Sequence, residues 1–131
     1  MATARRRMLV IDDDAKITDL FSDVFGDRYE VEVAMSGLDG LVAVLRERPD
    51  VVLLDINMPG INGLQVLRDI KKVDAKIPVI MVTANDQIAA AEEALKNGAF
   101  AYLPKPFHLQ YAQHLVEAAL FEAPTKSRGA H

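Results

Sequence analysis

The sequence predicts an α/β protein built on an open, doubly wound parallel sheet. Five short runs of apolar and β-branched residues alternate with five segments of helical periodicity along the 131 residues. Strict alternation with short connections is typical of a parallel sheet with right-handed crossovers and helices on both faces. A closed barrel of this type needs eight such units, so five units favour the open sheet.

The expected strands are short and mostly apolar throughout. They lie at 8–11, 29–34, 51–54, 77–82 and, more weakly, 101–103. The first, third and fourth runs are continuously apolar rather than alternating, which is typical of strands covered on both faces. Pro104 follows the last run and cannot donate a hydrogen bond within a sheet, so we expect that strand at the sheet edge.

The expected helices have apolar residues three and four positions apart. Asp14, Ser36 and Asp86 are placed to cap the first, second and fourth helices. Gly26 and Gly98 are placed to end the first and fourth. The segments are 17–25, a second helix that bears Leu38, Leu41, Val42 and Leu45 and ends before Pro49, then 66–73, 86–97 and about 108–121.

The composition suits one domain and excludes or disfavours several classes of function. We expect a domain over 7–121, with a basic lead-in at 1–6 and a polar tail or the start of a linker at 122–131. The absence of cysteine excludes thiolate metal sites and Cys nucleophiles. The net charge of -4 disfavours direct binding to nucleic acid or anionic membrane. No apolar stretch is long enough for a membrane span or a signal peptide, so we expect a cytoplasmic protein.

Polar residues follow several of the expected strands. Asp12 and Asp13 end the first, Asp55 ends the third with Asn57 just beyond, Thr83 ends the fourth, and Lys105 follows the fifth. In open α/β sheets the ligand site lies beyond the carboxyl ends of the strands. Two carboxylates about 5 Å apart repel by roughly 3 kcal/mol at an effective dielectric near 20, so a proton or a cation should fill the gap. All-oxygen ligands favour Mg²⁺.

Each of these residues, taken alone, has an ordinary structural interpretation. An aspartate before a helix is usually a cap, and Asp14 is expected to be one. Thr83 alone suits a helix entry, and Lys105 alone suits a surface lysine. Their joint placement at one sheet edge favours a site. A carboxylate beside a cation can attack phosphorus and form an aspartyl phosphate, with magnesium, an ammonium and a hydroxyl neutralising the phosphoryl oxygens.

The strand-end motifs resemble the receiver domain of two-component response regulators. The resemblance extends from about Arg7 to Phe121, and all four motifs occur in order, which makes it specific. The motifs are Leu9–Asp14 (LVIDDD), Val51–Gly60 (VVLLDINMPG) with Gly63, Val82–Ala84 (VTA) and Tyr102–Phe107 (YLPKPF). The resemblance implies a flavodoxin-like fold with strand order 2-1-3-4-5 and five helices.

The resemblance also implies a role for each matching residue. Asp55 matches the phosphoacceptor and Lys105 the lysine that meets the phosphoryl group. Asp12 and Asp13 match the acidic pair at the magnesium ion, to which Asn57 would offer its backbone carbonyl. A cis peptide is implied before Pro106.

Thr83 and Tyr102 match the switch pair of the family. Phosphorylation would draw the Thr83 hydroxyl toward the new charge, let Tyr102 turn inward, and change the face made by the fourth helix, fifth strand and fifth helix. Taken alone, Tyr102 also suits a strand aromatic that packs on the fourth helix. The implied partners are a sensor histidine kinase or phosphotransfer protein and a downstream effector protein or output domain, with a homodimer through that face as a further possibility.

Two other functions share parts of this pattern. A Mg²⁺-dependent phosphatase with an aspartyl nucleophile would need a second Asp two positions after Asp55, where this chain has Asn57, and an amide cannot shuttle the proton. A flavin mononucleotide protein of similar fold would need a phosphate-binding loop after the first strand, where the three aspartates would repel phosphate. We therefore expect a phosphoacceptor regulator rather than an enzyme.

Overall fold

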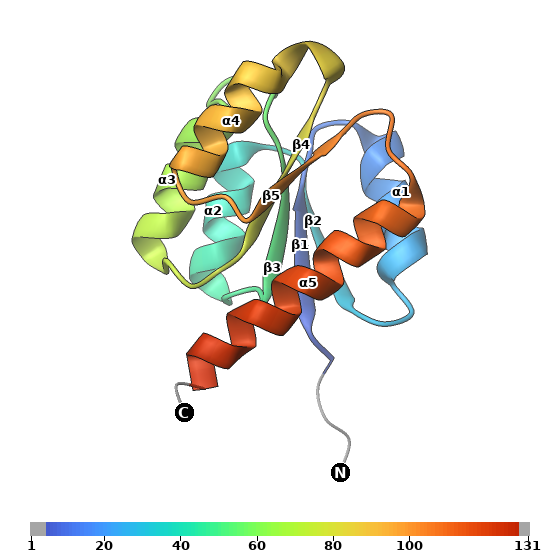
Figure 1. Ribbon diagram of the computed structural model, residues 1–131, viewed down its shortest axis with the longest axis vertical. Helices are drawn as coiled ribbons and strands as arrows, with labels where there is room; N and C mark the ends of the chain where they lie inside the picture. Colours follow the sequence, from blue (N-terminus) through green and yellow to red (C-terminus); the bar gives the residue numbers. More distant parts are fainter. Residues whose placement is uncertain (1–4, 129–131) are drawn as a thin grey trace.

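The structure is a computed structural model that describes residues 5–128, the side chains of Asn85 and of 122–128 excepted. Its centre is a five-stranded parallel sheet in the order β2-β1-β3-β4-β5 (Figure 1). This order and the predicted fold class are confirmed. The strands are β1 (Arg7–Ile11), β2 (Glu30–Ala34), β3 (Val51–Asp55), β4 (Val79–Thr83) and β5 (Ala101–Pro104).

Burial of the strands follows their place in the sheet. Every residue of the central strands β3 and β4 is buried, as their continuous apolar runs predict. Strand β5 lies at the edge, as expected for a strand that ends in Pro104. Strand β4 begins at Val79 rather than at the predicted Ile77, because Pro78 has no N–H to donate; its carbonyl still accepts from Val52 N at 3.0 Å.

The helices follow the strands in strict alternation. They are α1 (Ala15–Phe25), α2 (Gly37–Arg46), α3 (Gly63–Val73), α4 (Ile88–Lys96) and α5 (Leu109–Arg128). The side chains of Asp14 and Ser36 cap α1 and α2, as predicted. Helix α1 ends at Gly26, and α4 is followed by Gly98, whose φ of +101° only glycine adopts without strain.

The predicted start of the fourth helix is wrong. Asp86 does not cap it: a short 3₁₀ turn, η1 (Asn85–Gln87), comes first, and α4 begins at Ile88 without a side-chain cap. Gln87 N donates to Ala84 O at 3.0 Å and closes that turn, so the backbone groups at the helix entrance are engaged before α4 starts.

The last helix is longer than predicted. Helix α5 continues past Phe121 to Arg128, although the segment from Glu122 onward includes Pro124. Residues 129–131 of the expected tail, and 1–4 of the expected lead-in, lie outside the described residues. Arg5 of the lead-in donates to the carbonyls of Gly26 and Asp27 at 2.9 and 3.1 Å.

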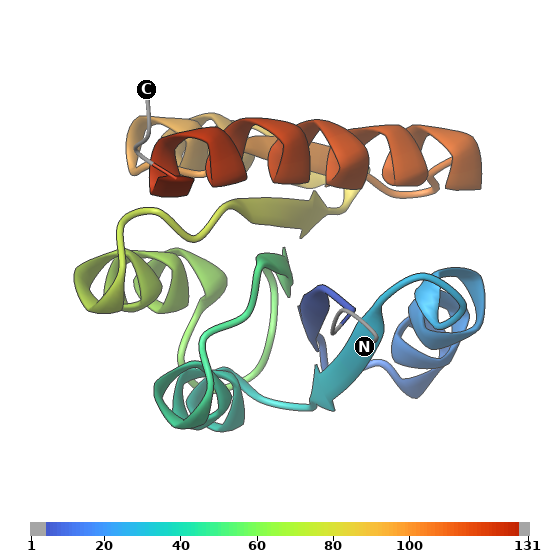
Figure 2. The same ribbon diagram turned by 90° about the horizontal axis from the view of Figure 1, so that it is seen from below.

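Two apolar cores lie on the two faces of the sheet. Helices α1 and α5 pack on one face, around Phe21, Phe25 and Val116, whereas α2, α3 and α4 pack on the other, around Val44, Leu67 and Ala91. Figure 2 shows α1 and α2 on opposite sides of the strands. Within the described residues, no helix is long and apolar enough to cross a membrane. This arrangement leaves the carboxyl ends of all five strands at one edge, where the polar residues gather.

Candidate phosphoacceptor site

Three carboxylates meet at the carboxyl ends of β1 and β3. Asp12 directly follows β1, and Asp55 is the last residue of β3; the register Ile11↔Leu54 places the two aspartates side by side. One carboxylate oxygen from each of Asp12, Asp13 and Asp55 lies within 4.8 Å of the other two. Asp12 and Asp55 are buried and Asp13 is exposed. The structure thus brings together the acidic residues that the strand ends predicted.

Backbone amides hold the two buried carboxylates in place. Asp14 N donates to Asp12 Oδ1 at 2.9 Å, and Asn57 N donates to Asp55 Oδ1 at 3.2 Å. The other oxygen of Asp12, Oδ2, is buried and has no hydrogen-bond partner in the described part of the chain. Asp14 caps α1, as predicted, and its amide in addition fixes Asp12, a contact that residue types do not reveal.

Burial makes both carboxylates reluctant to ionise. The pKa of Asp12 rises from its ordinary value of 3.8 to about 6, mainly because the group is buried and in addition because Asp55 lies close. The pKa of Asp55 is also raised, again mainly by burial, while the Lys105 ammonium opposes the rise. Two buried carboxylates in one pocket therefore carry a cost that a bound cation would relieve.

Lys105 reaches the cluster from the loop after β5. Its Nζ lies 3.9 Å from Asp12 Oδ2 and 4.0 Å from Asp55 Oδ1. The Lys105–Pro106 peptide is cis, as the resemblance implied. Lys105 N donates to Thr83 O at 2.6 Å, which ties the lysine loop to the end of the neighbouring strand β4. A single ammonium thus faces two buried carboxylates.

Thr83 places a hydroxyl at the same edge. It ends β4, one residue beyond Val82, which pairs with Asp55 in register. The side chain is fully buried, and Oγ1 makes no hydrogen bond to any described residue. Because a buried hydroxyl without a partner is unfavourable, this group is ready to bond with an oxygen that enters the site.

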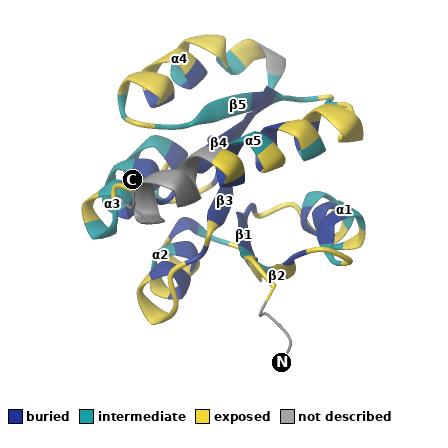
Figure 3. Ribbon diagram, turned by 60° about the horizontal axis from the view of Figure 1, so that its bottom comes forward, coloured by how far each residue is buried: buried dark blue, intermediate teal, exposed yellow. Residues whose placement is uncertain are grey.

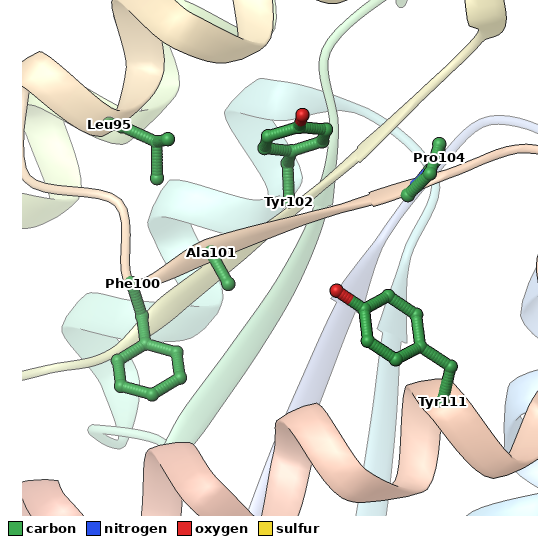
Figure 4. A pocket seen from close by; sticks show the side chains of 6 residues that line it. All are labelled: Leu95, Phe100, Ala101, Tyr102, Pro104 and Tyr111. Atoms are coloured by element: carbon green, nitrogen blue, oxygen red, sulfur yellow. The ribbon is translucent and has the colours of Figure 1, made fainter.

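Tyr102 lies on the strand beside Thr83. Side chains two residues apart in a strand point to the same face, so Thr83 shares a face with Met81, the register partner of Tyr102. The Tyr102 ring is half-buried and packs on the α2–α3–α4 side of the sheet. It also borders a cavity of about 380 Å³ between α4, β5 and α5, which Tyr111 of α5 also lines (Figure 4).

Gly63 lies against the backbone at the end of β3 and so affects the position of Asp55. Gly63 begins α3 and its N–H donates to Ile56 O at 3.0 Å. A Cβ at this position would lie 2.6 Å from the backbone oxygen of Asp55 and 2.6 Å from Ile56 Cα. Any larger residue would displace the end of β3, so Gly63 is a positioning residue for Asp55. Gly63 belongs to a motif of the sequence, but its residue type alone does not predict this positioning role.

Comparisons with known proteins find the same domain. The family model for the response regulator receiver domain matches residues 8–118. The DNA-binding response regulator MtrA of Mycobacterium tuberculosis is 39% identical over 108 residues, which are 82% of this chain and 47% of MtrA. The regulatory protein AtoC of Escherichia coli is 36% identical over 119 residues, 90% of this chain and 26% of AtoC. The chain therefore spans half or less of these curated relatives.

Solved structures share the fold over nearly the whole chain. A response regulator receiver domain protein from Clostridium thermocellum superimposes with a TM-score of 0.87 at 32% identity, covering 92% of this chain and 98% of that one. NtrX from Brucella abortus, in complex with ADP, gives a TM-score of 0.91 at 30% identity, covering 96% of this chain and 29% of NtrX.

Proposed function

Because this chain belongs to the response regulator receiver family, we propose that it is a signalling switch that accepts a phosphoryl group on Asp55. The observation that carries the proposal is the convergence of three carboxylates within 4.8 Å, with the Lys105 ammonium about 4 Å from two of them. The unpartnered hydroxyl of Thr83 completes the set. Together these groups offer Asp55 as the nucleophile. A cation held by the carboxylates, the Lys105 ammonium and the Thr83 hydroxyl would each neutralise part of the phosphoryl charge.

The donor set fits Mg²⁺. Asp12, Asp13 and Asp55, with the backbone carbonyl of Asn57, would hold the ion. They are hard oxygen ligands, and the buried Oδ2 of Asp12 lacks a hydrogen-bond partner among the residues described. The ion would supply charge neutralisation for the incoming phosphoryl oxygens. It would also relieve the repulsion between Asp12 and Asp55.

Asp55, Lys105 and Thr83 have different roles in phosphoryl transfer. A carboxylate oxygen of Asp55 attacks phosphorus while the bond from phosphorus to the donor imidazole breaks, and the imidazole leaves with the electron pair. The Lys105 ammonium neutralises one phosphoryl oxygen, and Thr83 Oγ1 donates a hydrogen bond to another. The bound phosphoryl group draws Thr83 toward it. Tyr102 then turns into the space beside β4 and alters the surface formed by α4, β5 and α5.

The proposal implies partners on both sides of the switch. A sensor histidine kinase or a phosphotransfer protein supplies the phosphoryl group, and an effector protein or an output domain reads the α4–β5–α5 surface. A phosphorylation-dependent homodimer through that surface is one form the readout can take. Such a regulator works in the cytoplasm and catalyses only its own phosphorylation and slow dephosphorylation.

Intact-mass spectrometry after treatment with acetyl phosphate tests the acceptor. The wild-type chain should gain one phosphoryl group with Mg²⁺ and none with EDTA, whereas Asp55→Asn should gain none. Asp14→Asn is the matched control, since it removes a neighbouring charge but keeps the α1 cap, and it should still be phosphorylated. A phosphoryl adduct on Asp55→Asn would disprove the assignment.

A further inference from the structure

Helix α2 carries its larger apolar side chains on the side facing solvent. Leu38, Val42 and Leu45 are 65%, 50% and 66% exposed. We call these three residues the outer stripe; Figure 3 shows exposed residues along the outer side of α2. The buried residues of the same helix are small or short: Gly37, Gly40, Ala43 and Val44. Helix α2 is therefore apolar on its outer side as well as on the side that packs on the sheet, which is typical of a helix that is covered on both of these sides.

Close packing against the sheet fixes this orientation. A Cβ at Gly40 would overlap the Ile11 side chain of β1, and one at Gly37 would lie 2.5 Å from Ile61 Cγ2. Helix α2 therefore cannot rotate to bury its leucines, because larger residues do not fit beneath it. Of the predicted apolar pattern Leu38, Leu41, Val42 and Leu45, only Leu41 packs against the core, and the other three residues form the exposed face.

Helices α1 and α4 carry charged residues on their solvent-facing sides. Helix α1 presents Lys16, Asp19 and Asp23 to solvent, and α4 presents Glu92, Glu93 and Lys96. Apolar side chains are exposed on α4 and α5 as well, but among the described helices only α2 has three large apolar residues that are each at least 50% exposed. The outer stripe also lies on a different helix from the cavity beside Tyr102, which α4, β5 and α5 form.

Charges on one flank of the stripe are arranged for an antiparallel copy of the same helix. Asp39 and Arg46 lie seven residues apart, about two helical turns, and so share a flank. The Asp39 carboxylate has no hydrogen bond or ion pair with any part of the chain that the structure describes. Arg46 pairs with Glu32 of β2 and, with five N–H donors, can bind a second carboxylate.

We propose that two copies of this chain associate through the outer stripe, with α2 packed antiparallel on α2 about a two-fold axis near Val42. Antiparallel pairing sets Asp39 of each copy opposite Arg46 of the other. The exposed side chains of the stripe present roughly 300 Å² per copy, so the pair buries roughly 600 Å² of apolar surface. With its charged flanks the contact approaches about 1,000 Å², the lower end for a specific interface, so we expect a weak dimer whose population depends on concentration.

Sedimentation equilibrium of the 131-residue chain between about 5 and 500 μM tests the proposal. The wild-type chain should be largely dimeric at the upper concentration. Leu38→Gln with Leu45→Gln should weaken association at least tenfold while the circular dichroism spectrum stays folded. The control Leu95→Gln, on α4 and 40% exposed, should leave association unchanged. A wild-type chain that is monomeric throughout overturns the proposal, as does a dimer that only Leu95→Gln weakens.

The charged flank gives a second readout. Asp39→Lys should weaken association about threefold or more, because it places two like charges opposite each other. Asp86→Lys, an exposed aspartate of η1, changes net charge equally and should have little effect. Equal effects of the two substitutions would contradict the antiparallel arrangement. Asp55→Asn should dimerise like the wild type, since the contact does not involve the phosphoacceptor.

Cross-linking locates the contact directly, because the chain has no cysteine of its own. Val42→Cys should form dimers with a short thiol-reactive cross-linker, whereas Leu95→Cys should not. Cross-linking of Leu95→Cys but not of Val42→Cys would place the interface on α4 and overturn the proposal. Equal cross-linking of both would indicate random encounters and overturn it too.

Discussion

Replacing Asp12 by asparagine should stabilise the fold when divalent metal is absent. Asp12 is only 2% exposed, one of its oxygens has no hydrogen-bond partner among the described residues, and Asp55 lies beside it. Its pKa is raised from 3.8 to about 6, mainly by burial. One pKa unit corresponds to about 1.4 kcal/mol, so ionised Asp12 costs the folded state roughly 3 kcal/mol.

The sign of the pH dependence follows from the direction of the shift. Between about pH 4 and pH 6 the folded chain keeps the Asp12 proton that the unfolded chain releases. The stability due to this group is therefore full below about pH 4 and is lost as pH rises through about 6. The advantage of Asp12→Asn over the wild type should grow by about 2.5 kcal/mol between pH 4 and pH 7.5.

Urea unfolding in EDTA, followed by circular dichroism at several pH values, measures this difference. Titrating groups that do not contact Asp12 are common to both proteins and cancel. In a separate thermal unfolding experiment at pH 7.5, the melting temperature of the Asp12→Asn variant should be roughly 10 °C higher than that of the wild type. The control Asp14→Asn keeps the α1 cap and should change stability by less than about 0.5 kcal/mol at pH 7.5. A difference between Asp12→Asn and the wild type that is the same at pH 4 and pH 7.5 would refute the reasoning.

Three further substitutions test individual parts of the structure. Thr83→Val should raise the unfolding free energy by about 1 kcal/mol in denaturant titrations, because it removes a buried hydroxyl with no described partner; a loss of stability would mean that the hydroxyl is bonded. Gly98→Ala should lower the melting temperature, since φ of +101° costs a residue with a Cβ about 1–2 kcal/mol; an unchanged temperature would contradict this. Lys105→Met should slow phosphorylation by acetyl phosphate at least about tenfold in a mass-spectrometric time course, and an unchanged rate would remove the lysine from the mechanism.

The strand-end residues could be predicted because parallel strands have only one carboxyl edge. Asp12, Asp55 and Thr83 each follow an apolar run, so the alternation of strands and helices is enough to bring them together. The pairing of β1 with β3 does not follow from the order of the elements along the chain. It was implied by the resemblance, and the registers of the sheet confirm it.

Contacts that depend on packing could not be predicted from residue types. The 3₁₀ turn before α4 is closed by the backbone hydrogen bond from Gln87 N to Ala84 O. Residue types do not reveal this bond, so the prediction of Asp86 as the helix cap is wrong. The exposure of Leu38 and Leu45 depends on the close approach of Gly40 to Ile11 across the sheet, and periodicity alone does not show which face of an apolar helix is covered.

Chemical trapping of the acyl phosphate tests directly whether Asp55 is the phosphoacceptor. Borohydride reduces an aspartyl phosphate to homoserine, and tandem mass spectrometry of the digested chain then locates the modified residue. After treatment with acetyl phosphate and Mg²⁺, we expect homoserine in place of Asp55, and we expect none when EDTA replaces Mg²⁺. Homoserine in place of Asp12 or Asp13 instead, or equal conversion of Asp55 without divalent metal, would contradict this expectation.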